Sequence, residues 1–178
     1  MKFYAYGTAE NKKCLFVDLG VIFAADSIPG IDFILPDPGF IIDKKDDLLG
    51  IILTHAHEGH IGAISHIWTS LKCKIFATPF TAILIQEKFK EKKIDILKYL
   101  TIVPLNSNIK LGSFEIDFVT LTHSILEPNG LSITTPLGTI LHTGDWKIDP
   151  NPLLGGSTDE KKLKKIGDKG VSAMICDS

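Results

Sequence analysis

The feature that most constrains this chain is a buried strand that runs directly into a turn rich in histidine. The run Gly50-Ile51-Ile52-Leu53 is apolar on both alternations, which is typical of a strand covered on both faces. Thr54-His55-Ala56-His57-Glu58-Gly59-His60 follows it at once, and residues 61–71 are predicted to form a helix. Strand-to-helix turns of this kind are where α/β proteins gather functional groups.

The histidines of this turn can converge on a metal ion. Successive residues of an extended chain alternate in direction, so His55 and His57 project to the same side, and the turn can bring His60 back toward them. Neutral imidazole is the usual protein ligand of zinc, and a catalytic site needs about three such ligands plus an open position for water. The chain has only 6 histidines, so three in one turn favour a metal site over a solvated turn.

Two downstream clusters offer further ligands at strand ends. His123 follows the predicted strand 114–121, and Asp145 lies in a Gly-Asp turn after the predicted strand 139–142. Alone, each would be an ordinary strand-end residue or turn. Both residues become better candidates for metal ligands because they occur downstream of the histidine turn.

The remaining pattern predicts a layered α/β structure. Helices are expected at residues 61–71, 79–92 and 159–166, the last opened by the capping-box pattern Ser157-Thr158-Asp159-Glu160 and stopped by Gly167. Residues 171–176 are expected to form a core strand. With 178 residues and 44% hydrophobic content, one domain is expected. The other strands are expected at residues 2–6, 14–18, 49–53, 74–77, 100–104, 114–121, 131–134 and 139–142.

Composition limits the environment and the partners. The net charge of −2 gives no support for a broad basic face, so RNA binding cannot be inferred from charge. Cys14, Cys73 and Cys176 are far apart and form no CxxC pair, which indicates reduced thiols and a cytoplasmic location. No signal sequence or long apolar run indicates secretion or membrane spanning.

The order of these clusters resembles the metallo-β-lactamase superfamily, and within it the ribonuclease J family. The resemblance implies an αββα sandwich of which the N-terminal half to two-thirds is present, so that residues 1–178 form a single, incomplete domain. It spans nearly the whole chain. The phrases that carry it lie at residues 15–20, 34–38, 53–58, 77–81, 120–124, 141–149 and 176–178.

That resemblance also implies a function, namely hydrolysis of RNA phosphodiesters at a two-zinc site. His55, His57 and His123 would hold the first zinc. Asp145, the catalytic carboxylate, would bridge to the second zinc, which His60 would also bind. Asp18 would steady the histidine turn without binding metal. Ser124 would contact phosphate, although an ordinary strand-end hydroxyl is the other interpretation.

One residue departs from the family motif His-x-His-x-Asp-His, because its aspartate falls at Gly59. A further family histidine and the family's inserted domain have no counterpart here. We therefore expect one zinc, bound by His55, His57, His123 and Asp145, and weak or absent activity. Glu58, next to the gap, is expected to point away from it.

Several alternatives stay open. RNA is the partner that the resemblance implies. Exposed sheet edges would favour a homo-oligomer, and a companion C-terminal fragment would supply the rest of the fold. The chain could instead be a hydrolase of small substrates, such as β-lactams or thioesters, because many chemistries share this fold. It could also be a non-catalytic, metal-binding remnant.

Overall fold

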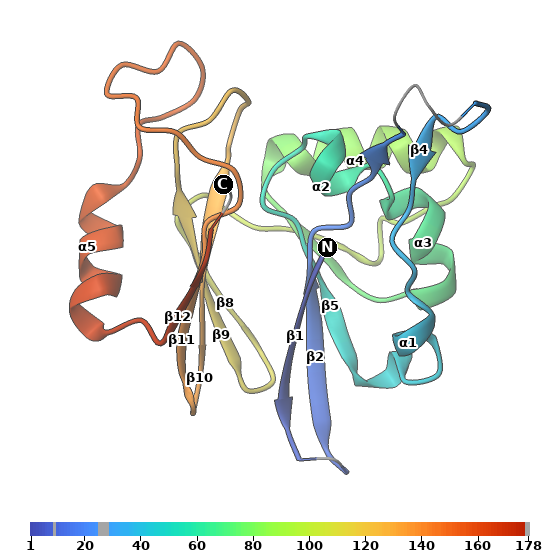
Figure 1. Cartoon of the computed structure of the whole chain (residues 1–178), viewed down its shortest axis with the longest axis horizontal. Helices are drawn as coiled ribbons and strands as arrows, with labels where there is room; N and C mark the ends of the chain where they lie inside the picture. Colours follow the sequence, from blue (N-terminus) through green and yellow to red (C-terminus); the bar gives the residue numbers. More distant parts are fainter. Residues whose placement is uncertain (9, 25–28, 177–178) are drawn as a thin grey trace.

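The computed structural model describes residues 1–8, 10–24 and 29–176, which form two facing β-sheets with helices outside (Figure 1). The first sheet has the strand order β1-β2-β5-β6-β7, and the second has the order β12-β11-β10-β9-β8. The first sheet consists of β1 (Lys2–Gly7), β2 (Lys12–Val17), β5 (Leu48–Ile52), β6 (Ile75–Ala77) and β7 (Leu100–Ile102). The second consists of β8 (Asn108–Leu111), β9 (Phe114–Thr120), β10 (Asn129–Thr135), β11 (Gly138–His142) and β12 (Ala173–Ile175).

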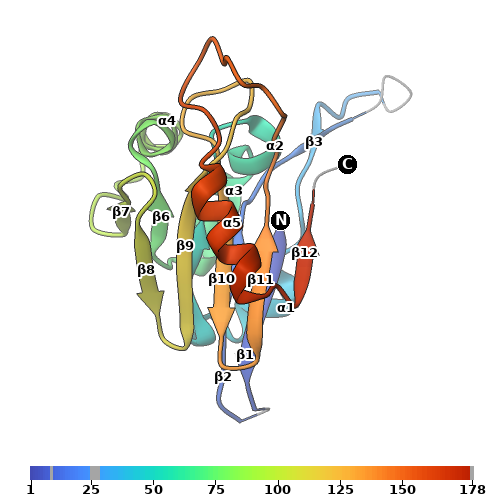
Figure 2. The ribbon, with the colours of Figure 1, turned by 90° about the vertical axis from the view of Figure 1, so that its left-hand side faces the viewer.

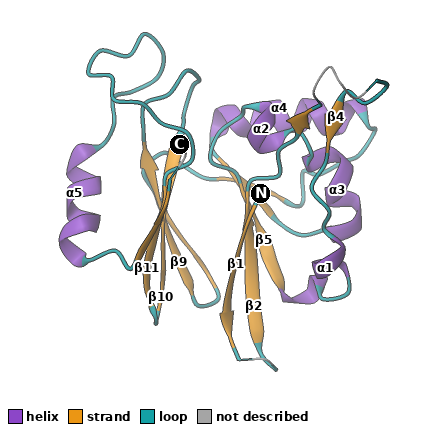
Figure 3. Cartoon of the chain, viewed as in Figure 1, coloured by secondary structure: helices purple, strands orange, loops and turns teal. Residues whose placement is uncertain are grey.

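Helices cover the outer face of each sheet, which completes the predicted αββα order (Figure 3). The first sheet is covered by α2 (Glu58–Ile61), α3 (Ile64–Leu71) and α4 (Pro79–Glu91). Across the second sheet lies α5 (Glu160–Lys169) (Figure 2). The short α1 (Gly39–Ile42) and the 3-10 helix η1 (Lys45–Asp47) precede β5. None of the helices among the described residues is long and apolar enough to cross a membrane.

The alternation along β2 explains how one strand serves two cores. Leu15 and Val17 pack between the sheets with Phe118 of β9, whereas Phe16 packs toward the helices with Trp68 of α3. All three β2 side chains are fully buried. Burial of each such side chain is worth about 1.5–3 kcal/mol. The prediction that the central strands are covered on both faces is therefore confirmed.

Strand directions carry the functional residues to one end of the sandwich. In the first sheet β2, β5, β6 and β7 run parallel, and only β1 is antiparallel to its neighbour. In the second sheet β8 to β11 are antiparallel, and β12 pairs parallel with β11. The C-terminal ends of β5, β9 and β11 lie at the same end of the two facing sheets (Figure 1).

Helix boundaries differ from the sequence prediction in two places. The predicted helix 61–71 starts earlier, as α2, and breaks before α3 because the His60 carbonyl accepts a hydrogen bond from the Leu19 N–H instead of from the helix. Gly167 does not stop α5, which continues to Lys169. Gly170 follows with a positive φ of 94°, which glycine adopts at little steric cost.

Other differences concern weak or exposed segments. The two-residue strands β3 (Ile22–Phe23) and β4 (Phe33–Ile34) are too short for a periodic signal, and no residue of β8 is buried. The strand predicted at residues 171–176 forms as β12 (Ala173–Ile175), but it is not a core strand. There β12 forms an edge of the second sheet, and Ala173 and Met174 are exposed.

Candidate metal centre

Four ligand atoms meet where the two sheets end. His55 and His57 follow β5 of the first sheet, while His123 follows β9 and Asp145 follows β11 of the second. One ligand atom from each of these four residues lies within 4.8 Å of all the others. Residues up to 90 positions apart in the sequence are thus brought together by the facing of the sheets, and neither sheet holds the full set.

Four distances within this cluster lie near those expected around a tetrahedral zinc. His57 Nδ1 lies 3.1 Å from His55 Nε2 and 3.1 Å from His123 Nε2. Asp145 Oδ2 lies 3.7 Å from His55 Nε2 and 3.6 Å from His123 Nε2. Ligand atoms that each lie about 2.0–2.1 Å from a tetrahedral zinc are separated by about 3.4 Å. Three imidazoles and one carboxylate are also a donor set that zinc accepts.

Burial keeps one of these imidazoles, that of His55, in its neutral form. The His55 side chain is fully buried, and burial, followed by the neighbouring charge of His60, lowers the pKa of His55 to about 3. At neutral pH His55 is therefore uncharged and keeps one nitrogen lone pair. A metal ligand must be in this neutral form.

His60 lies beside the cluster and joins two carboxylates. Its Nδ1 is 2.8 Å from Asp18 Oδ2, and its Nε2 is 2.9 Å from Asp145 Oδ1. Burial opposes a charge on His60, but the hydrogen bond to Asp18 and the charges of Asp18 and Asp145 outweigh it and raise the pKa of His60. Asp145 thus turns one oxygen toward the four-residue cluster and the other toward His60.

Asp18 holds the start of the histidine turn. It adopts a left-handed backbone with φ of 61° directly after β2, and its carboxylate accepts hydrogen bonds from the Thr54 N–H at 2.8 Å and the Thr54 hydroxyl at 2.9 Å. Burial alone would raise the pKa of Asp18, but the hydrogen bond and charge of His60 and the bond from the Thr54 N–H lower it. Asp18 thus contacts the residue directly before His55 through both carboxylate oxygens.

Gly59 lines a small cavity next to this cluster. The cavity, of about 130 Å³, is also lined by His60, Gly144, Asp145 and Cys176. No heavy atom lies within 4 Å of the place where a side chain at Gly59 would begin. Glu58 does point away, because its carboxylate pairs with Lys88 of α4.

The remaining polar residues near the site play different parts. Ser124 is exposed beside His123. His142 is buried and forms a hydrogen bond of 2.8 Å with the Tyr4 hydroxyl, so it packs between the sheets. Sequence reasoning gave no role to Thr54, whose hydroxyl contacts Asp18, His55 and His60. Its only signal was its place before His55.

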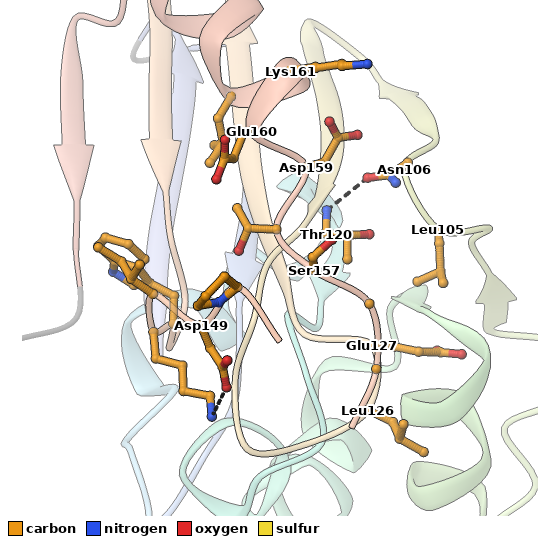
Figure 4. A pocket seen from close by; sticks show the side chains of 18 residues that line it. Leu105, Asn106, Thr120, Leu126, Glu127, Asp149, Ser157, Asp159, Glu160 and Lys161 are labelled. Atoms are coloured by element: carbon orange, nitrogen blue, oxygen red, sulfur yellow. Dashed lines mark hydrogen bonds and ion pairs between the residues drawn. The ribbon is translucent and has the colours of Figure 1, made fainter. Parts of the chain in front are cut away.

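A larger hollow of about 1,000 Å³ opens next to the cluster, starting at Trp146, the residue after Asp145 (Figure 4). Its walls include four carboxylates against two lysines, so it is not a basic groove. Glu127 is already engaged with the Phe80 N–H, Asp159 with the Lys162 N–H, and Asp149 with Lys147. The charged residues that line the hollow are Glu127, Lys147, Asp149, Asp159, Glu160 and Lys161.

Sequence comparison relates this chain to ribonuclease J. No family model matches the chain. It is 42% identical over 177 residues to ribonuclease J of Sinorhizobium meliloti, covering 98% of this chain and 31% of that protein. It is 38% identical over 168 residues to ribonuclease J of Helicobacter pylori, covering 94% and 24% respectively. The chain is ribonuclease J-like over nearly its whole length. It spans about a quarter to a third of the length of these relatives.

Solved structures agree on the fold of this ribonuclease J-like chain. The metallo-β-lactamase fold protein YhfI of Bacillus subtilis matches 81% of the chain and 55% of its own length, with a TM-score of 0.50 and 17% identity. Zn²⁺-bound PqqB of Methylobacterium extorquens matches 97% of the chain and 58% of its own length, with a TM-score of 0.60 and 9% identity. The comparisons do not favour the small-substrate hydrolase or the non-catalytic remnant.

Proposed function

We propose that the chain is the metal-binding part of a ribonuclease J-type hydrolase of RNA phosphodiesters, and that it binds one zinc. The observation that carries this proposal is the convergence of His55, His57, His123 and Asp145 on one point, in a chain 42% identical to a ribonuclease J. His60 and Asp18 support the cluster from outside.

Each residue has a defined task in this proposal. A zinc ion bound here would lower the pKa of water and neutralise charge that develops on phosphate oxygens. Neutral His55 would hold the ion through Nε2, and Asp145 would hold it through Oδ2, while the other oxygen of Asp145, Oδ1, contacts His60. Ser124 is exposed beside His123, so its hydroxyl can reach a phosphate from solvent.

The proposal includes a weakened second metal position. The family aspartate falls at Gly59, so only His60 and Asp145 remain there, and two ligands hold zinc poorly. Loss of the second ion costs several kcal/mol of transition-state stabilisation, where about 1.4 kcal/mol is a factor of ten in rate. We therefore propose that hydrolysis by this chain is slow or absent.

Metal analysis and an RNA cleavage assay on the purified chain test this function. After zinc loading and dialysis, we expect one zinc per chain and slow or no release of product from a 5′-labelled RNA. His57→Ala should lose the zinc, whereas His66→Ala, an exposed histidine on α3, should keep it.

Each other outcome contradicts a separate part of the proposal. No bound zinc in the wild type would remove the metal site. Two zinc ions, or rapid hydrolysis of RNA, would contradict the account of Gly59. Turnover of a chromogenic β-lactam that His57→Ala abolishes would replace RNA with a small substrate.

A further inference from the structure

Thr54 occupies the junction between Asp18 and the metal cluster. It is fully buried at the end of β5, and its backbone N–H donates to Asp18 Oδ1 at 2.8 Å. Its hydroxyl oxygen lies 2.9 Å from Asp18 Oδ2, 3.1 Å from His55 Nδ1 and 3.3 Å from His60 Nδ1. One hydroxyl thus faces a carboxylate and two imidazoles.

Counting hydrogens assigns each of these contacts a direction. A hydroxyl has one hydrogen to donate and two lone pairs, and a carboxylate at neutral pH only accepts. The Thr54 hydrogen therefore points to Asp18 Oδ2. His60 Nδ1 lies closer to Asp18, at 2.8 Å, than to Thr54, so its hydrogen also points to the carboxylate. The Thr54 oxygen is left to accept from His55.

This direction fixes the tautomer of His55. Because Nδ1 of the neutral ring donates its hydrogen to the Thr54 oxygen, the other ring nitrogen, Nε2, carries no hydrogen and keeps its lone pair. His55 Nε2 is the atom that faces His57 Nδ1 and Asp145 Oδ2. The lone pair therefore points at the centre of the cluster before any ion arrives.

We propose that Thr54 is a positioning residue. Its hydroxyl connects the Asp18 carboxylate to His55 Nδ1 and so holds the His55 ring in its metal-binding tautomer. The inference rests on the proposed metal site and deepens it. Metal-bound histidines usually donate their other nitrogen to a carboxylate or a carbonyl. Here a threonine hydroxyl accepts that hydrogen, and the carboxylate behind it orients the hydroxyl.

A purely structural role for Thr54 can be separated from this one. The backbone bond from the Thr54 N–H to Asp18 holds the turn and does not need the side chain. Thr54→Val keeps that bond and nearly the same shape but removes the hydroxyl. Asp18 Oδ2 keeps His60 as a partner, while His55 Nδ1 loses its acceptor.

Zinc affinity is measured by competition with a chromophoric chelator on the full chain. Thr54→Val should weaken zinc binding about 10–100-fold, the usual effect of losing such a supporting partner. Thr54→Ser, which restores a hydroxyl, should bind close to wild type. Thr78→Val is the matched control, because Thr78 is equally buried after β6 and its hydroxyl contacts Thr81.

The tautomer is measured directly in the metal-free wild type by long-range ¹H–¹⁵N correlation spectra of the histidine rings. We expect the hydrogen of His55 on Nδ1, and a mixture of tautomers in Thr54→Val. A hydrogen on Nε2 in the wild type would overturn the proposal, and so would wild-type zinc affinity in Thr54→Val. The wild-type spectrum decides the question even if Thr54→Val does not fold.

A different experimental result would contradict the proposed metal site. A wild type that binds no zinc would overturn the proposed function, whereas the tautomer spectrum would still test the role of Thr54. A wild type that binds zinc, together with an unaffected Thr54→Val, would overturn only the role of Thr54.

Discussion

Gly59 leaves room for a carboxylate, the group that the proposed function assigns to this position in the family motif. No atom would obstruct a side chain there, and the position adjoins the cavity shared with His60 and Asp145. Gly59→Asp should therefore supply a third ligand at the second metal position. We expect zinc to rise from one toward two ions per chain, and RNA hydrolysis to rise about tenfold or more if at least ~1.4 kcal/mol is regained.

The control for this gain is the same change at an equally open glycine. Gly167 in α5 also has no neighbour within 4 Å of an added Cβ. Gly167→Asp should leave zinc content unchanged, as measured by metal analysis of both variants. An unchanged content in Gly59→Asp as well would refute the idea that this glycine limits metal binding.

The cysteines differ sharply in accessibility. Cys14 and Cys73 are buried and Cys176 is exposed. Burial raises the pKa of the Cys73 thiol to about 12, and burial followed by the charge of Asp47 raises the pKa of Cys14. Only thiolates react readily. One thiol per chain should therefore react with Ellman's reagent at pH 8, and the other two only in denaturant.

The raised pKa values of the two buried thiols also predict how thiol reactivity depends on pH. Because both buried thiols stay protonated above the ordinary thiol pKa of 9.0, raising the pH to 9 should still leave two thiols unreacted in the folded chain. Cys176→Ser should leave none that reacts before unfolding. Rapid reaction of two or more thiols in the native wild type would be inconsistent with the burial of Cys14 and Cys73.

Single residues of the site differ in how far sequence could foresee their position. Spacing suggests that His55 and His57 lie together, and the family resemblance adds His123 and Asp145. One ligand atom of each of these residues lies within 4.8 Å of the others. The hydroxyl of Thr54 gives no such signal, since its value depends on Asp18, which lies 36 positions earlier. Hydrogen-bond direction follows from three-dimensional contacts and not from spacing.

Among the elements, α2 packs against the loop after β2 so closely that only glycine fits. A Cβ at Gly20 would lie 1.6 Å from the Gly59 carbonyl oxygen and 2.5 Å from the His60 nitrogen. Gly20→Ala must displace α2 and the histidine turn. We expect a loss of about 1–3 kcal/mol or more in unfolding free energy, measured by urea denaturation, together with weaker zinc binding. Wild-type zinc affinity in a folded Gly20→Ala chain would contradict this packing.

The opposite result is expected at Gly167, inside α5. Its surroundings are open, and its φ is not positive, so alanine fits the helix without strain. Gly167→Ala should raise the unfolding free energy by about 0.5–1 kcal/mol, because glycine loses more backbone entropy in a helix. Denaturation by urea measures this gain, and a loss of stability would show that α5 ends at Gly167 after all.

Element ends were the hardest features to predict. Glycine favours a helix end when its φ is positive, and sequence does not show whether Gly167 or Gly170 has a positive φ. The break between α2 and α3 depends on a carbonyl bonded to Leu19, a distant partner. By contrast, the central strands were predicted because apolar runs on both alternations demand cover on both faces.

At the scale of the whole molecule, the four-residue ligand cluster lies at the interface between the two sheets. The layered class could be predicted from the strand pattern, whereas sequence does not show which strands pair or that β5, β9 and β11 end together. That facing is set by the core between the sheets, where Val17 and Ile52 pack with Phe118. Stability and metal binding should therefore be linked.

Zinc should raise the thermal stability of the chain because it ties His55 and His57 of one sheet to His123 and Asp145 of the other. Ligand at about 100 times its dissociation constant adds about 2.7 kcal/mol, which for this chain length shifts Tm by about 5–10 °C. Calorimetry with zinc and with EDTA measures the shift. His57→Ala should abolish it.

Phe118→Ala provides the contrast, because it weakens the core between the sheets and keeps all four ligands. It should lower the unfolding free energy by about 3–5 kcal/mol with or without zinc, and a zinc-induced rise in Tm should remain. If His57→Ala showed the same rise as the wild type, the ion would be binding elsewhere, and the cluster would not be what joins the two sheets.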